Sequence, residues 1–157
     1  MSRVLIVGDY SYDYYEKSLQ NAFESLGYEV ESLAHVNGVF LDFIKKLLLR
    51  YDLTYLCRFF ERRILSYLAA GNFSICIVFG GMLISENLFK YLSGREGLKM
   101  ILVNHDNPFT NNAFSFQRLI RSAAEYDFVL TPRMSTYQNF EKVGANPENF
   151  IKAVAGG

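Results

Sequence analysis

The sequence predicts an α/β fold with a doubly wound, mostly parallel sheet of the Rossmann-like type, built as a three-layer α/β/α sandwich. Short apolar runs alternate along the chain with segments whose apolar residues repeat at helical spacing, the pattern of parallel strands joined by right-handed crossovers. Several of these runs are continuously apolar, as expected for strands that are covered on both faces. A length of 157 residues fits one domain, so we expect a single domain over residues 1–157.

The expected elements follow from the apolar periodicity and from the glycines that end helices. Strands are expected at residues 3–7, 28–33, 75–79, 98–103, 127–131 and 150–154, in the sheet order 3-2-1-4-5-6. Helices are expected at residues 14–26, 39–68, 85–92, 113–124 and 135–143. The segment 39–68 forms either one long helix or two helices with a break near Asp52.

Composition excludes several classes of function. Lys and Arg together number 16 and are balanced by 16 Asp and Glu, which argues against a general nucleic-acid binder, although a local basic patch stays possible. Cys57 and Cys76 lie in no Cys/His cluster, so we expect neither a disulfide framework nor a metal site. No apolar run approaches the ~20 residues of a membrane span, and we expect a cytoplasmic protein.

The loop after the first strand begins Gly8-Asp9-Tyr10 and is a candidate binding segment, because ligands bind outside the carboxyl ends of parallel strands. A dinucleotide-binding domain needs the pattern G-x-G-x-x-G there, and only Gly8 is present while Tyr10 fills the approach. We therefore expect no NAD, FAD or other cofactor. Two interpretations stay open: a turn glycine with packed tyrosines, or substrate contacts by Gly8, Asp9 and Tyr10.

Paired glycines, Gly80 and Gly81, follow the third strand, where they either make a tight turn or admit a ligand close to the backbone. Arg133 follows the fifth strand and can meet an anionic group. Arg118 and Arg121 on the preceding helix can do the same, although helix arginines are normally solvated. His35, after the second strand, is expected to cap or pack.

The densest polar cluster, residues 104–112, follows the fourth strand directly. His105 is a candidate general base near neutral pH, with Asp106 as its orienter or as an alternative base. Asn104 and Asn107 are candidate substrate contacts. The competing interpretation is structural, since Asn and Asp are common turn and cap residues.

The segment 39–68 is both basic and apolar, with six Lys or Arg residues between positions 45 and 63. The preferred interpretation is a core helix with a solvated basic face. The alternative is an amphipathic helix that contacts a membrane surface peripherally.

Three segments resemble one family. They are residues 3–8, a strand that ends in glycine; the strand that runs into Asn104-His105-Asp106-Asn107-Pro108-Phe109; and the stretch 126–145, which contains Tyr126-Asp127 and Gly144-Ala145. In order and spacing the chain resembles the N-terminal half of a GT-B-type glycosyltransferase, close to the CgeB-like spore-maturation group. The resemblance spans nearly the whole chain.

The resemblance implies that two Rossmann-like domains face each other across a cleft. The N-terminal domain then receives the sugar acceptor, the C-terminal domain binds the nucleotide-sugar donor, and transfer needs no metal. By analogy, the acceptor side is lined by Gly8, Asp9, Tyr10, Gly80, Gly81, His105 and Asp106, of which His105 and Asp106 are the catalytic candidates. The residues themselves add Asn104, Asn107 and Arg133 as candidate substrate contacts. Asp106 matches the acidic residue of the family's loop directly, and His105 matches more loosely.

The resemblance also implies that a donor-binding half is missing from residues 1–157, so that the chain by itself binds acceptor and transfers nothing. The alternative is a non-catalytic Rossmann-like module that binds a partner through its aromatic loops. Apolar surface that faces a second domain in the family is expected to favour a homodimer here.

Overall fold

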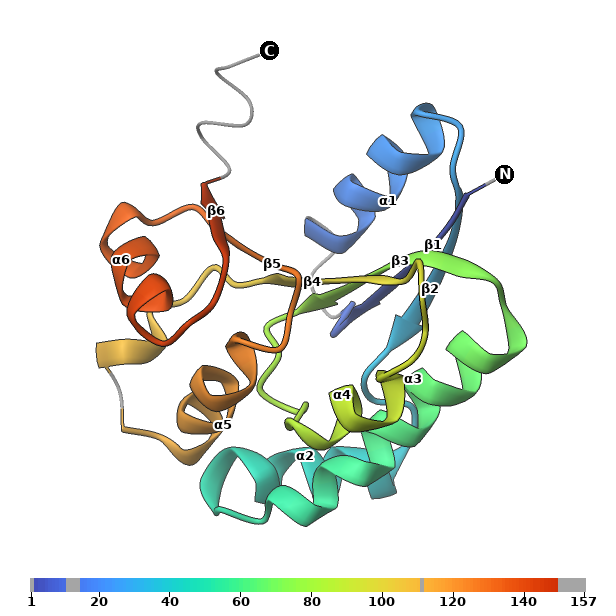
Figure 1. Cartoon of the computed structure of the whole chain (residues 1–157). Helices are drawn as coiled ribbons and strands as arrows, with labels where there is room; N and C mark the ends of the chain where they lie inside the picture. The colour runs from blue at the N-terminus through green and yellow to red at the C-terminus, as the bar shows by residue number, and fades with distance from the viewer. Residues whose placement is uncertain (1, 11–14, 111, 150–157) are drawn as a thin grey trace.

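The computed structural model describes residues 2–10, 15–110 and 112–149 and contains one six-stranded sheet (Figure 1). Every pair of neighbouring strands in it is parallel. The strands are β1 (Arg3–Gly8), β2 (Glu29–Ala34), β3 (Phe73–Phe79), β4 (Lys99–Val103), β5 (Phe128–Thr131) and β6 (Pro147–Asn149). The helices are α1 (Tyr15–Ser25), α2 (Val39–Arg50), η1 (Thr54–Cys57), α3 (Arg58–Ala70), α4 (Asn87–Leu92), η2 (Pro108–Thr110), α5 (Phe114–Ala123) and α6 (Met134–Lys142).

Helices cover both faces of the sheet, which confirms the predicted three-layer α/β fold (Figure 1). On one face, α1 packs its partly buried Leu19 and Phe23 against the strand residues Val4 and Ile6. On the other face lies the main core, to which the strands and the helices α3, α4, α5 and α6 all contribute. Because apolar residues alternate between the two faces of each strand, every strand has to be covered on both sides.

The predicted sheet order, 3-2-1-4-5-6, is wrong: the strands run β2-β1-β3-β4-β5-β6. The physical reason lies in two strands. β3 is almost continuously apolar and mostly buried, so it takes a central place beside β1. β2 exposes Glu29 and Ser32, polar side chains that suit the edge of a sheet. The chain therefore crosses over β1 through α2 and α3 to reach β3.

The expected break near Asp52 separates two helices, since α2 ends at Arg50 and the short 3-10 helix η1 leads into α3. The structure has a strand at the end of its described part that the sequence did not predict. β6 comprises Pro147–Asn149, and the strand expected at residues 150–154 lies outside the described residues.

Arg118 contradicts the expectation that helix arginines are solvated, because its side chain on α5 is only 1% exposed. Its guanidinium donates to the carbonyl oxygens of Met82 at 2.8 Å and Leu48 at 3.3 Å, and to the hydroxyl of Thr54 at 3.4 Å. Leu48 lies in the last turn of α2, where carbonyl groups lack helical partners. Arg118 therefore joins α5 to α2, to η1 and to the loop after β3.

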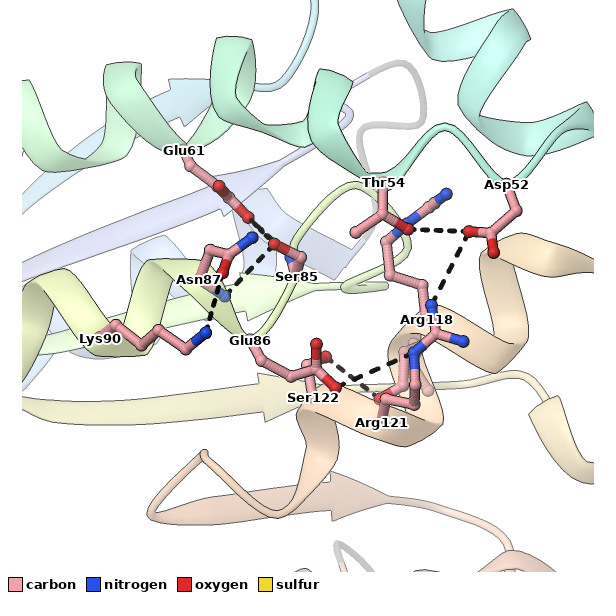
Figure 2. Close-up of polar contacts among 11 residues, drawn as sticks. Asp52, Thr54, Glu61, Ser85, Glu86, Asn87, Lys90, Arg118, Arg121 and Ser122 are labelled. Atoms are coloured by element: carbon pink, nitrogen blue, oxygen red, sulfur yellow. Dashed lines mark hydrogen bonds and ion pairs between the residues drawn. The ribbon is translucent and has the colours of Figure 1, made fainter.

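A second buried polar group supports the same loop from α3. The Glu61 carboxylate accepts hydrogen bonds from the Ser85 amide at 2.8 Å and from its hydroxyl at 2.6 Å (Figure 2). Burial raises the pKa of Glu61, while the bonds from Ser85 and the charge of Arg118 act in the opposite direction. Together Arg118 and Glu61 fix the segment that leaves the carboxyl end of β3.

Candidate functional site

A cavity of about 260 Å³ opens at the carboxyl ends of the strands. It lies between β1 and β3, where the order in which strands are added to the sheet reverses, the switch point at which doubly wound sheets bind ligands. The loops after β1 and β2, the helices α1 and α2, and the ends of β3 and β4 with the loops that follow them all contribute to its walls. The lining residues are Asp9, Tyr15, Glu16, His35, Lys45, Leu49, Phe79, Gly80, Gly81, Met82, Leu83, Val103, Asn104, His105 and Asp106.

The β1 side of the cavity carries opposite charges. Asp9 forms an ion pair with Lys45 of α2, with 2.8 Å between Oδ2 and Nζ. The buried Glu16 of α1 accepts the amide hydrogen of Asp9 at 3.3 Å. Gly8 makes room for this arrangement, because a β-carbon there would lie 2.6 Å from Cγ of Glu16. Gly8 thus positions Glu16 and is not among the lining residues.

Tyr10, a predicted substrate contact, does not line the cavity. It packs among the partly buried apolar residues on the α1 face of the sheet, and its hydroxyl donates to the carbonyl of Ile6 at 3.3 Å. Its φ of 53° is the one left-handed backbone among non-glycine residues that the structure describes. Burial raises the pKa of its phenol.

Gly80 and Gly81 both line the cavity, and both have left-handed backbone, with φ of 78° and 74°. Their surroundings differ. A β-carbon on Gly80 meets nothing within 4 Å, so this backbone is open to a ligand. A β-carbon on Gly81 would lie 2.7 Å from Cδ1 of Leu102 in the core.

These two glycines form a matched pair for mutation. Gly80→Ala is expected to cost about 1 kcal/mol of unfolding free energy, because only the left-handed conformation is penalised. Gly81→Ala is expected to cost about 3 kcal/mol, because the collision with Leu102 adds to that penalty. Denaturant unfolding of both variants measures the difference, and equal losses would contradict the geometry.

Asn104 forms the floor of the cavity at the end of β4 and is 1% exposed. Its side-chain oxygen accepts the amide hydrogen of Asp106 at 2.9 Å, which holds the start of the loop. Its side-chain nitrogen is buried and has no hydrogen-bond partner among the described residues. A buried amide with unused donors is costly unless something binds it, so Asn104 is well suited to contact a ligand oxygen.

The ring of His105 packs between two aromatic rings, with centroid distances of 4.3 Å to Tyr15 and 6.3 Å to Phe79. Desolvation lowers the pKa of His105, while the carboxylates of Asp106 and Glu16 act to raise it. The imidazole is therefore mainly neutral near pH 7 and able to accept a proton. Arg133 does not reach the cavity, but its Nε donates to the carbonyl of His105 at 3.1 Å and so holds this loop.

His35 lines the cavity, where it was expected only to cap or pack. Its Nε2 lies 3.4 Å from the carbonyl oxygen of Phe79, and since a carbonyl only accepts, this nitrogen carries the hydrogen. Its Nδ1 is then an acceptor, buried and without a hydrogen-bond partner among the described residues. Burial lowers the pKa of His35 to about 4, so the ring is neutral.

His35 makes the stability depend on pH in a defined direction. Its pKa is about 6.5 in the unfolded chain and about 4 in the folded protein, so between these values the unfolded chain binds more protons. Stability is complete above the higher value and declines as the pH falls. We expect the unfolding free energy to be about 2 kcal/mol lower at pH 5 than at pH 7 from this group. Urea unfolding of His35→Gln measured against the parent protein tests this, because the variant should lose that part of the pH dependence.

Six of the ten predicted site residues line the cavity: Asp9, Gly80, Gly81, Asn104, His105 and Asp106. Gly8 and Arg133 support it from outside, through Glu16 and the carbonyl of His105, and Tyr10 packs on the α1 face of the sheet. Asn107 also lies outside the lining, where its side chain accepts the amide hydrogen of Phe109 and begins η2. Sequence reasoning missed Tyr15, Glu16 and Lys45. One signal existed for Lys45, a cation that follows Ile44 inside the apolar stripe of α2.

The described part of the chain holds no cluster of three or more His, Cys, Asp or Glu side chains that could bind a metal ion. Cys57 and Cys76 are free and buried. Burial raises the pKa of each thiol to about 12, so neither is a reactive thiolate. Among the described helices, none has the length and apolar character to cross a membrane.

The architecture thus belongs to the doubly wound α/β class, with a polar and aromatic cavity at the switch point of its sheet. Comparison of the sequence with models of protein families gives no match, and comparison with curated proteins gives none either.

Proposed function

We propose that this domain is the acceptor-binding half of a sugar-nucleotide-dependent glycosyltransferase of the GT-B type. The observation that carries the proposal is the cavity at the switch point, which combines carboxylates, buried amide and imidazole groups, and aromatic rings. The resemblance of the sequence to the N-terminal half of the CgeB-like group points the same way.

The chemistry of the cavity suits a hydroxylated ligand better than an anionic one. A sugar hydroxyl both donates and accepts, and the cavity walls offer the acceptor Nδ1 of His35 together with the donor amide of Asn104. The apolar face of a sugar ring can lie against Tyr15 and Phe79.

A diphosphate is a poor match for the same walls. Lys45 is already paired with Asp9, and the nearby Glu16 and Asp106 carry further negative charge. The first loop also lacks the glycines that let a backbone approach a pyrophosphate. The donor is therefore assigned to a second domain, and the acceptor to this one.

The proposed transfer needs one base on the acceptor side. As the acceptor hydroxyl oxygen forms a bond to the anomeric carbon, its proton passes to His105 or Asp106, and the bond from the anomeric carbon to the diphosphate breaks. The neutral state of His105 fits the role of base, and Asp106 is its adjacent carboxylate. Gly80 leaves space for the acceptor beside the end of β3.

Calorimetric titration with UDP- and GDP-sugars tests the division of labour between two domains. We expect affinities no stronger than millimolar for this chain, and no transfer to monosaccharide or polyol acceptors by this chain without a donor-binding domain. Micromolar binding of any nucleotide sugar here would overturn the assignment of this domain to the acceptor. Transfer that begins once a donor-binding domain is supplied would support it.

A further inference from the structure

Helix α2 exposes large apolar side chains on its outer face. Val39, Phe40 and Phe43 are 88%, 62% and 58% exposed, while Ile44 and Leu48 on the inner face are buried in the core. A core helix with a purely solvated basic face, the preferred interpretation of the sequence, does not describe this arrangement. Contiguous exposed apolar residues of this size mark an interaction surface.

The exposed apolar area continues onto the neighbouring helix. Phe40 packs edge to face on Phe59 of α3, with ring centroids 5.6 Å apart, and the Arg58 guanidinium lies 5.2 Å from the centre of the Phe59 ring. A groove runs along α2 beside these residues and is lined by Phe43, Lys46, Leu47, Leu49, Arg50 and Tyr51. We call this region the α2 surface; it consists of the exposed residues Val39, Phe40, Phe43, Arg50, Arg58 and Arg62.

The charge of the α2 surface is positive and uncompensated. Arg50 and Arg62 are exposed and make no ion pair with any residue that the structure describes. Lys46 is neutralised by Asp42 at 2.7 Å, and Glu61 is buried. Residues 39–68 hold six Lys or Arg against three Asp or Glu, whereas the whole chain has a net charge of zero.

We propose that the α2 surface docks the protein on an anionic phospholipid bilayer. Apolar side chains enter the boundary between headgroups and acyl chains, and the arginines meet lipid phosphates and anionic headgroups. A second copy of the chain fits less well, because a two-fold interface would place these arginines against their own counterparts. The inference does not depend on the proposed glycosyltransferase function.

Docking in this way has a consequence for the cavity. Leu49 of α2 lines both the groove of the α2 surface and the cavity at the switch point. A docked molecule therefore holds the cavity within about one helix width, ~10 Å, of the lipid surface.

Vesicle flotation tests the proposal with the complete chain. We expect binding to phosphatidylcholine vesicles that contain phosphatidylglycerol, weaker binding at high salt, and little binding to phosphatidylcholine alone. Phe40→Ser with Phe43→Ser is expected to lower partitioning at least about tenfold. Arg50→Gln and Arg62→Gln are expected to lower it about fivefold each.

The matched control is Leu26→Ser, because Leu26 is 73% exposed and follows α1 on the opposite face of the sheet. This variant should partition into vesicles like the parent protein. Circular dichroism is the check that every variant is folded. Equal binding to neutral and anionic vesicles, or an equal loss in the Leu26 control, would overturn the proposal. So would a dimer in light scattering that only the phenylalanine variants dissociate, since the α2 surface would then be an interface between copies.

Discussion

Replacement of Arg118 with methionine is expected to lower the free energy of unfolding by about 4 kcal/mol, the largest stability loss that we expect from a single change in this fold. Methionine fills similar space but donates no hydrogen bond. The carbonyl oxygens of Met82 and Leu48 would then lose their bonds to the guanidinium in a buried place. The Leu48 carbonyl also lies in the last turn of α2, where a cation interacts favourably with the helix dipole.

Arg121→Met is the matched control, because Arg121 lies on the same helix but its contacts with Asp52 and Glu86 are long, 3.8 and 3.9 Å, and exposed (Figure 2). Such pairs contribute less than about 1 kcal/mol. Denaturant unfolding of both variants measures the two effects. Similar losses in the two proteins would show that the buried guanidinium does not hold α2 and α5 together.

The proposed function predicts that loss of the acceptor-side base has the largest effect on activity. In the proposed transferase reaction, with a donor-binding domain supplied, His105→Gln should lower the transfer rate by about 10²- to 10⁴-fold if the imidazole takes the proton. The remaining activity should lose its acid limb, because the titrating group is gone. Steady-state rates against pH measure both effects.

The variant Asp106→Asn tests whether Asp106 is the base itself or a residue that positions and tunes His105. The negative charge of Asp106 raises the pKa of His105, so its removal should move the acid limb of the rate profile to lower pH. If Asp106 is itself the base, Asp106→Asn should lower the transfer rate strongly, and His105→Gln should retain most of the parent rate. Asn107→Ala is the control, since this residue lies outside the cavity lining. Unchanged rates in both His105 and Asp106 variants would contradict a catalytic role for this loop.

The fold class could be predicted because each strand has a local apolar pattern in the sequence. The sheet order depends instead on how the strands differ from one another in polarity. Glu29 and Ser32 in β2 and the unbroken apolar run of β3 held the information that places β2 at the edge. The commonest order for this fold class does not take such differences between strands into account. The strand at Pro147–Asn149 could not be predicted for a simpler reason, because three residues that include a proline carry almost no strand signal.

The loops of the candidate site could be predicted because the carboxyl ends of parallel strands meet at one edge. Asp9, Gly80 and Asn104 follow directly from that rule. Glu16 and Lys45 reach the cavity from helices. The rotation of a helix about its axis depends on tertiary packing, so the sequence alone does not predict which helix residues line the cavity. Arg118 went unrecognised for the same reason, because exposure of a helix residue depends on what covers it.

The most direct test of the proposal that the cavity binds an acceptor is chemical-shift mapping of the isotope-labelled chain with unlabelled monosaccharides and polyols. We predict saturable shifts for the amides of Gly80, Gly81, Asn104 and His105 with at least one such ligand, and smaller shifts in residues remote from the cavity. UDP- and GDP-sugars should leave these amides unmoved at the same concentration. Saturable shifts of these four amides with a nucleotide sugar, and none with any hydroxylated acceptor, would contradict the proposed acceptor site.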